Sequence, residues 1–185
     1  MPEPAIPPLP DPNTYWLLPG RLLAGEYPGA PDPAAARRKV GAFVAAGVDT
    51  FIDLTEPGEL IPYALLLPAG AEHHRLPIRD LGVPDDPRHM QAILDAIDTA
   101  LAAGRGVYVH CWGGVGRTGT VVACWLQRRG RSPEAALAEL AGHWKTVGKF
   151  HRTPRSPETD GQRAWVHRWP QTLAALAASE AGQKP

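Results

Sequence analysis

One short segment places a cysteine, three glycines and an arginine close together: residues 110–118 have the sequence H-C-W-G-G-V-G-R-T. The apolar run at 107–109 before it predicts a buried strand, and the apolar run at 120–126 after it predicts a helix. A glycine-rich turn between a strand and a helix N-terminus binds anions, because backbone N–H groups converge there and the helix dipole favours negative charge. The residues expected to line this anion site are Trp112, Gly113, Gly114, Val115, Gly116 and Arg117.

Each polar residue of the segment has a chemical role to play. Cys111 is expected at the floor of the turn, where the N–H groups favour the thiolate, a nucleophile that then needs no dedicated base. Arg117 closes the turn and can offer its planar fork to two oxygens of a phosphoryl group. Thr118 is placed to donate its hydroxyl to the sulfur. His110 is expected to hydrogen-bond the loop backbone rather than to act as an acid or a base.

These residues match the pattern H-C-x-x-G-x-x-R-[S/T] at every specified position, and the segment resembles the phosphate-binding loop of protein tyrosine and dual-specificity phosphatases. The resemblance implies a phosphomonoester hydrolase that forms a cysteinyl-phosphate and needs neither a metal nor another cofactor. A purely structural corner, with Cys111 buried and Arg117 as a helix cap, is the simpler interpretation, but the flanking strand and helix favour a catalytic loop. A rhodanese-type sulfur-transfer domain also uses a cysteine loop, yet that chemistry does not call for Thr118.

The leaving oxygen of a phosphate ester needs a proton, and Asp80 is the candidate donor. It lies in L-P-I-R-D-L-G-V-P, residues 76–84, on a Gly/Pro loop after a predicted strand, where ligands bind in open α/β sheets. The same carboxylate would then accept a proton from the water that attacks the cysteinyl-phosphate. The segment is similar to the general-acid loop of dual-specificity phosphatases, and only Asp80 matches that position. In the alternative, Asp80 closes an Asx-turn and Asp85 or Asp86 is the acid.

Gln162 is the candidate for orienting that water. Trp165, Val166 and Trp169 follow it at positions i+3, i+4 and i+7, so the glutamine is expected to point with them into the protein. Its placement resembles the glutamine that orients the hydrolytic water in tyrosine phosphatases. The alternative is a buried amide that is hydrogen-bonded to backbone.

Apolar runs and helical periodicities alternate along the chain, which predicts an α/β fold with a central, mostly parallel sheet flanked by helices, as in dual-specificity phosphatases. The predicted strands are residues 15–18, 22–25, 48–54, 72–78 and 107–109. The predicted helices are residues 33–46, 87–103, 118–129, one opened by Ser132 and Pro133, and one from Pro157 or Glu158 that Pro170 kinks or restarts. Residues 56–67 are expected to form a loop with a short helical piece.

A chain of 185 residues is long enough for one domain with a sizeable core. We expect a flexible Pro-rich segment at 1–13, a single phosphatase domain at 14–178 and a disordered tail at 179–185. The formal charge is zero, so no overall field favours nucleic acid, and no apolar run is long enough to span a bilayer. The N-terminus does not have the pattern of a secretory signal. Two cysteines, one of them needed as a free thiolate, indicate a cytoplasmic protein, and a monomer is expected.

The order of the motifs along the chain indicates which group of phosphatases it resembles. The acid precedes the nucleophile, as in dual-specificity phosphatases, and the phosphotyrosine-recognition loop of the larger tyrosine-specific enzymes is missing. We expect a small, bacterial, dual-specificity-like phosphatase that acts on a phosphorylated protein or a small phosphorylated molecule. A phosphoinositide, an inositol phosphate or an RNA 5′-phosphate as substrate remains an alternative, as does a phosphate-binding module without turnover.

Overall fold

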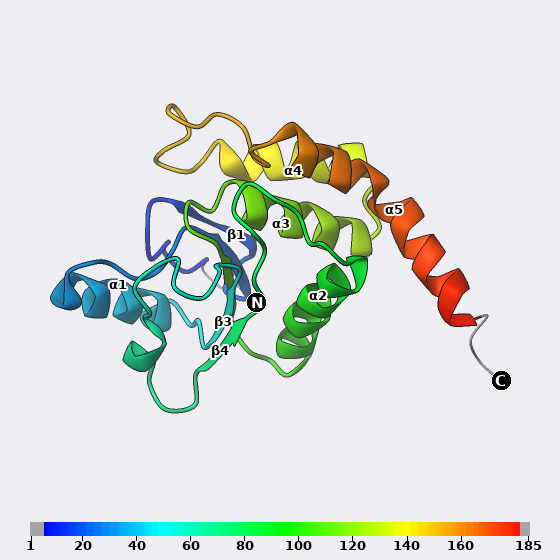
Figure 1. The fold of residues 1–185 in the computed structure, drawn as a ribbon. Helices are drawn as coiled ribbons and strands as arrows, with labels where there is room; N and C mark the ends of the chain where they lie inside the picture. Colours follow the sequence, from blue (N-terminus) through cyan, green and yellow to red (C-terminus); the bar gives the residue numbers. More distant parts are fainter. Residues whose placement is uncertain (1–5, 182–185) are drawn as a thin grey trace, which may run out of the picture.

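A computed structural model describes residues 6–181 of the chain, and residues 1–5 and 182–185 lie outside the described part. A five-stranded sheet in the order β1-β2-β5-β3-β4 forms its centre (Figure 1). Only the β1–β2 pair is antiparallel; the other pairs are parallel. This confirms the predicted α/β class with a mostly parallel sheet. The strands are β1 (Thr14–Leu18), β2 (Leu22–Gly25), β3 (Thr50–Asp53), β4 (Glu72–Arg75) and β5 (Val107–His110).

Helices cover both faces of this sheet (Figure 1). The larger core lies between one face and four helices, which are α2 (Pro87–Ala102), α3 (Gly116–Arg128), α4 (Pro133–Trp144) and α5 (Asp160–Ala181). The smaller core lies under α1 (Pro33–Ala45) and the 3₁₀ turn η1 (Ala64–Leu66). Side chains of β5 alternate between the two, because successive residues of a strand point to opposite faces. Val107 and Val109 enter the larger core, and Tyr108 enters the smaller one.

Local sequence signals set the helix starts. Asp32 accepts a hydrogen bond from the N–H of Ala35 (2.7 Å), and Ser132 accepts one from Ala135 (3.2 Å). In each case a proline follows at the first helical position, where its missing N–H costs nothing. Asp86 caps α2 in the same way. The predicted helical piece within 56–67 is confirmed as η1.

The structure differs from the expected elements at several ends. β4 is shorter than predicted: it stops at Arg75 because Pro77 cannot donate to the ladder, although the N–H of Ile78 still reaches the carbonyl of Leu54 (3.0 Å). Pro170 neither restarts nor interrupts α5. That helix continues to Ala181, three residues into the segment expected as a tail, whose remainder lies outside the described residues.

Residues 6–13, within the segment expected to be flexible, have neither helix nor strand. The indole of Trp16 donates to the carbonyl of Pro7 (3.0 Å), and the N–H of Gly148 donates to that of Pro12 (2.8 Å). This part of the N-terminus therefore packs along β1 and against the segment after α4. No helix between residues 6 and 181 is both long and apolar enough to cross a membrane.

The parallel strands bring their carboxyl ends to one edge of the sheet. Gly25 of β2 and Asp53 of β3 both stand in register with His110, the last residue of β5, and Arg75 of β4 stands in register with Asp53. The loops that follow these strands therefore begin side by side. This edge is where parallel α/β sheets bind ligands.

Candidate active site

Hydrogen bonds turn the carbonyl groups of the loop after β5 away from its centre. Every acceptor in this set belongs to the loop or to the first residue of α3. The bonds are His110 Nδ1 to Cys111 O (3.1 Å), the N–H of Tyr27 to Trp112 O (2.9 Å), Ser156 Oγ to Val115 O (2.7 Å), and Thr120 Oγ1 to Gly116 O (2.8 Å). Since peptide units are planar, carbonyls that point outward leave N–H groups pointing inward.

In the described part of the chain, four N–H groups of this loop have no protein acceptor. Among the described residues, no protein acceptor is bonded to the N–H of residues 112–115. Gly114 has φ +69°, in the left-handed region that such a turn requires. Cys111 lies at the same place, 3 % exposed, in a narrow pocket of about 30 Å³ shared with Arg117 and Asp80. Gly113, Val115, Gly116 and Arg117 line this pocket, whereas Trp112 and Gly114 do not. Anion binding by residues 112–117 stays a prediction.

Arg117 points into the protein, and carboxylate and carbonyl oxygens hold its guanidinium in place. Glu59 accepts from Nη1 (2.8 Å) and from Nη2 (2.6 Å), and the carbonyl of Ile78 also accepts from Nη1 (3.1 Å). The side chain of Arg117 is 2 % exposed. Burial opposes its charge, but the hydrogen-bonded Glu59, together with Cys111 and Asp80, raises the pKa of Arg117 above its ordinary value. Arg117 therefore brings a permanent positive charge to the pocket.

Asp80 lies at the rim, where its carboxylate forms an ion pair with Nη2 of Arg117 (2.9 Å). Its side chain is 53 % exposed. The alternative acids lie elsewhere: Asp86 caps α2 through the N–H of Arg88 (2.8 Å), and Asp85 borders a separate cavity beside that helix. Of the three, Asp80 alone lines the pocket that holds Cys111.

His110 is buried beneath the loop and is neutral. Burial is the main cause that lowers its pKa, to about 4, against an ordinary value of 6.5. Because its Nδ1 bonds to a carbonyl oxygen and must donate, Nε2 is left to accept from the hydroxyl of Tyr63 (2.7 Å). The backbone bond is the one expected from the sequence. This fixed tautomer anchors the start of the loop.

Thr118 and Gln162 differ in how their polar atoms are used. The hydroxyl of Thr118 is buried and, among the described residues, has no hydrogen-bond partner, so the expected bond to the sulfur is not made here. Gln162 is fully buried and bonds to backbone: Oε1 accepts from the N–H groups of Glu158 and Thr159, and Nε2 donates to the carbonyl of Gly82. This is the alternative left open for the amide.

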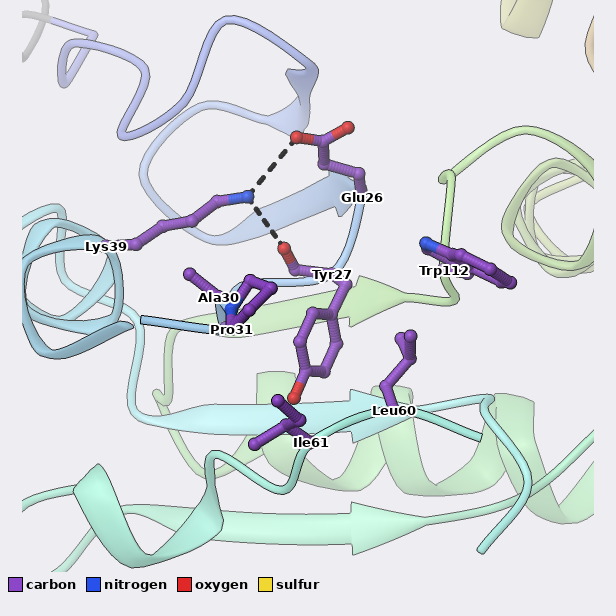
Figure 2. A pocket seen from close by; sticks show the side chains of 9 residues that line it. Glu26, Tyr27, Ala30, Pro31, Lys39, Leu60, Ile61 and Trp112 are labelled. Atoms are coloured by element: carbon purple, nitrogen blue, oxygen red, sulfur yellow. Dashed lines mark hydrogen bonds and ion pairs between the residues drawn. The ribbon is translucent and has the colours of Figure 1, made fainter. Parts of the chain in front are cut away.

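A groove of about 300 Å³ lies beside Trp112 of the loop (Figure 2). Trp112, 57 % exposed, forms one wall, and Tyr27 and Ile61 are among the residues opposite. At its far end Lys39 bonds to Glu26 (3.2 Å) and to the carbonyl of Tyr27 (2.8 Å). Trp112 thus lines a mostly apolar groove, while its chain neighbours Cys111 and Gly113 line the pocket that holds Arg117.

Some residues of the site had no evident signal in the sequence. Glu59 lies in the loop that follows β3, and β3 is the neighbour of β5 in the sheet. This position after a strand next to β5 is the one sequence signal that could have indicated a role for Glu59 in the site. Ser156, 3 % exposed, gives none, because its partner Val115 lies 41 positions away. Cys124 is a core residue: it is fully buried, and burial raises the pKa of its thiol.

Known proteins are similar to this chain in sequence. The chain is 38 % identical over 116 residues to the putative tyrosine phosphatase 067L of Invertebrate iridescent virus 3, covering 60 % of this chain and 44 % of that protein. It is 30 % identical over 117 residues to the phosphatidylglycerophosphate phosphatase PTPMT1 of Arabidopsis thaliana, covering 57 % of this chain and 35 % of that protein. The chain thus spans less than half the length of these curated relatives.

Solved structures agree with the sequence comparison. A kinase-associated phosphatase whose catalytic-site cysteine is replaced by serine superimposes with a TM-score of 0.69 at 25 % identity, covering 83 % of this chain and 88 % of that one.

Residues 29–131 match the profile of the family described as polymorphic toxin system, DSP-PTPase phosphatase. That match includes the cysteine loop, Glu59 and Asp80 and extends over more than half of the 185 residues. The chain therefore belongs to this family of dual-specificity and protein tyrosine phosphatases.

Proposed function

We propose that this chain hydrolyses phosphate monoesters through a cysteinyl-phosphate. The observation that carries the proposal is the pocket in which the sulfur of Cys111, unpaired loop N–H groups and the buried Arg117 come together. Three equatorial phosphoryl oxygens would fit the N–H groups and the guanidinium, and these fixed donors stabilise the transition state without reorganising. Membership of a phosphatase family supports the same chemistry.

Two displacement steps follow from the positions of the side chains. Cys111 Sγ attacks phosphorus, the ester P–O bond breaks, and Asp80 gives its proton to the departing oxygen. A water then attacks phosphorus, Asp80 takes up a proton, and the S–P bond breaks to release inorganic phosphate. The unpartnered hydroxyl of Thr118 is free to donate to the sulfur as it leaves. His110, neutral and committed to the loop backbone, exchanges no proton in either step.

Charge near the pocket favours a substrate with one phosphoryl group. Lys39 and Lys149 are both paired with Glu26 (3.2 and 2.8 Å), and Glu158 borders the pocket. A polyanion such as an inositol polyphosphate would meet the carboxylates of Glu26 and Glu158, and Lys39 and Lys149 are already paired. The organic part of a monoester, by contrast, would lie over Trp112 toward the apolar groove. We therefore favour a phosphorylated protein over the polyphosphorylated alternatives.

The purified protein should release phosphate from p-nitrophenyl phosphate and from a phosphotyrosine peptide in the presence of EDTA. Replacement Cys111→Ser should lower kcat at least about a thousandfold, because a hydroxyl is not ionised by the loop N–H groups. Cys124→Ala removes the other thiol, outside the pocket, and should retain activity. Unchanged turnover in Cys111→Ser, or loss of activity in EDTA, would contradict the mechanism. Binding of the phosphopeptide without phosphate release would indicate a binding module instead.

A further inference from the structure

The side chain of Gln162 joins three segments around the pocket. Its Oε1 accepts from the N–H groups of Glu158 (3.1 Å) and Thr159 (3.0 Å), and its Nε2 donates to the carbonyl of Gly82 (3.0 Å). The amide also lies directly over Gly116, the first residue of α3, where an added Cβ would come within 2.7 Å of Nε2. The residue is fully buried, so these bonds are shielded from water.

Gly82 closes the turn that carries the candidate acid. Its N–H donates to the carbonyl of Arg79 (2.9 Å), which places Asp80 and Leu81 at the two central positions. Leu81 has φ +58°, a left-handed conformation that a leucine rarely adopts. Its side chain is 57 % exposed, so burial does not stabilise the strained turn. Contacts from outside the turn must hold it in place.

Two such contacts are present. The carboxylate of Asp80 is paired with Nη2 of Arg117 (2.9 Å), and the carbonyl of Gly82 is bonded to Gln162. A phosphoryl group bound over Cys111 needs the guanidinium edge that Asp80 now occupies. Once that ion pair is displaced, the bond from Gln162 is the one of the two that still holds the turn.

The hydrogen-bonding capacity of the amide also separates two roles for Gln162. A water that attacks phosphorus must donate a hydrogen to an acceptor, and both lone pairs of Oε1 are already used by backbone N–H groups. The carboxylates of Asp80 and Glu158, which line the pocket, are the acceptors left to such a water. The water-orienting role expected by resemblance therefore has no free acceptor on Gln162.

We propose that Gln162 is a positioning residue that latches the Asp80 turn over the bound phosphoryl group. The latch keeps the carboxyl of Asp80 within reach of the leaving oxygen after Arg117 has exchanged its partner. This inference rests on the proposed phosphatase chemistry, and it assigns Gln162 to the proton-donation step rather than to hydrolysis of the cysteinyl-phosphate.

The test compares esters whose leaving groups differ in their need for a proton. The nearly isosteric variant Gln162→Met should lose roughly tenfold to a hundredfold in kcat/KM on phenyl phosphate, because phenolate must be protonated as it departs. On 2,4-dinitrophenyl phosphate, whose anion leaves unaided, kcat/KM should stay within about twofold of the parent. Asp80→Asn should show the same pattern more strongly. Gln127→Ala is the matched control, since that amide also donates to a backbone carbonyl, that of Val166 (3.1 Å), but lies outside the pocket.

A second measurement does not depend on turnover. Deuterium exchange of the amides of residues 79–83, with orthovanadate bound, should be faster in Gln162→Met than in the parent, whereas Gln127→Ala should match the parent. Equal exchange in Gln162→Met and the parent overturns the latch, even if the protein proves inactive on every ester. A fall in kcat on both esters with a burst of phenol release also overturns it, because that result identifies a role in the hydrolysis step. A parent that turns over neither ester refutes the proposed function, and the exchange measurement then decides the latch alone.

Discussion

At the scale of single residues, the site depends on which acceptors the guanidinium of Arg117 contacts. Glu59 takes one hydrogen from each terminal nitrogen of Arg117, and Asp80 forms an ion pair with Nη2. Glu59 thus fixes the outer end of the fork, while the bond to Asp80 is the one that a phosphoryl oxygen can replace. A charge-assisted, two-point bond of this kind sets orientation as well as energy.

Replacing Glu59 by glutamine should separate orientation from charge. The amide offers one acceptor oxygen and turns an NH₂ group toward the guanidinium, so Arg117 loses its fixed direction. Since hydrogen bonds to charged groups contribute about 1.5–3 kcal/mol, kcat/KM on p-nitrophenyl phosphate should fall roughly tenfold to a hundredfold. Steady-state kinetics check this. The exposed Glu56, in the same loop, provides the control variant Glu56→Gln. Equal rates in Glu59→Gln and the parent would remove Glu59 from the site.

The neutral His110 makes stability depend on pH. Its pKa is about 4 in the folded protein and near 6.5 in an exposed chain, so the unfolded chain binds more protons in between. The free energy of unfolding should therefore fall as the pH is lowered from 7 to 5, by about 2 kcal/mol from this residue. Urea unfolding at both pH values measures the slope, which should be smaller in His110→Gln. His143, whose pKa is also lowered by burial, supplies part of the slope that remains.

At the scale of elements, the phosphate loop is shaped by segments far from it in the sequence. The segment after β2 provides the N–H of Tyr27, and the segment before α5 provides the hydroxyl of Ser156. Gly114 allows the loop to pack against the end of β2: an added Cβ would stand 2.4 Å from the carbonyl carbon of Gly25. The loop and the edge of the sheet therefore cannot be altered independently.

The variant Gly114→Ala tests this packing. A side chain there is strained by φ +69° and collides with backbone, which should cost about 1–3 kcal/mol of stability and move the loop N–H groups, lowering kcat/KM at least about tenfold. Gly130→Ala is the matched control, because Gly130 has φ +91° with no atom within 4 Å of its added Cβ. It should lose some stability and keep full activity. Similar activity in the two variants would show that the contact with Gly25 does not matter.

At the scale of the whole molecule, local patterns predicted the architecture well. The signals that predict a helix or a strand lie within a few positions of one another in the sequence: apolar runs, prolines and the capping residues Asp32 and Ser132. The elements predicted from them match the structure closely. The main errors lie at ends that tertiary contacts decide, such as the stop of β4 at Arg75. Glu59 escaped prediction because it meets Arg117 across 58 positions, and only the folded sheet brings them together.

Six tryptophans are distributed over the molecule, and only Trp112 has a largely exposed ring. A collisional quencher in solution, such as iodide, will therefore reach that indole first. Trp125, Trp144 and Trp169 are buried in the core and are protected from the quencher. A molecule bound in the groove lies against the same ring and shields it from the quencher. Iodide quenching of the intrinsic tryptophan fluorescence should therefore report whether the groove beside Trp112 is occupied.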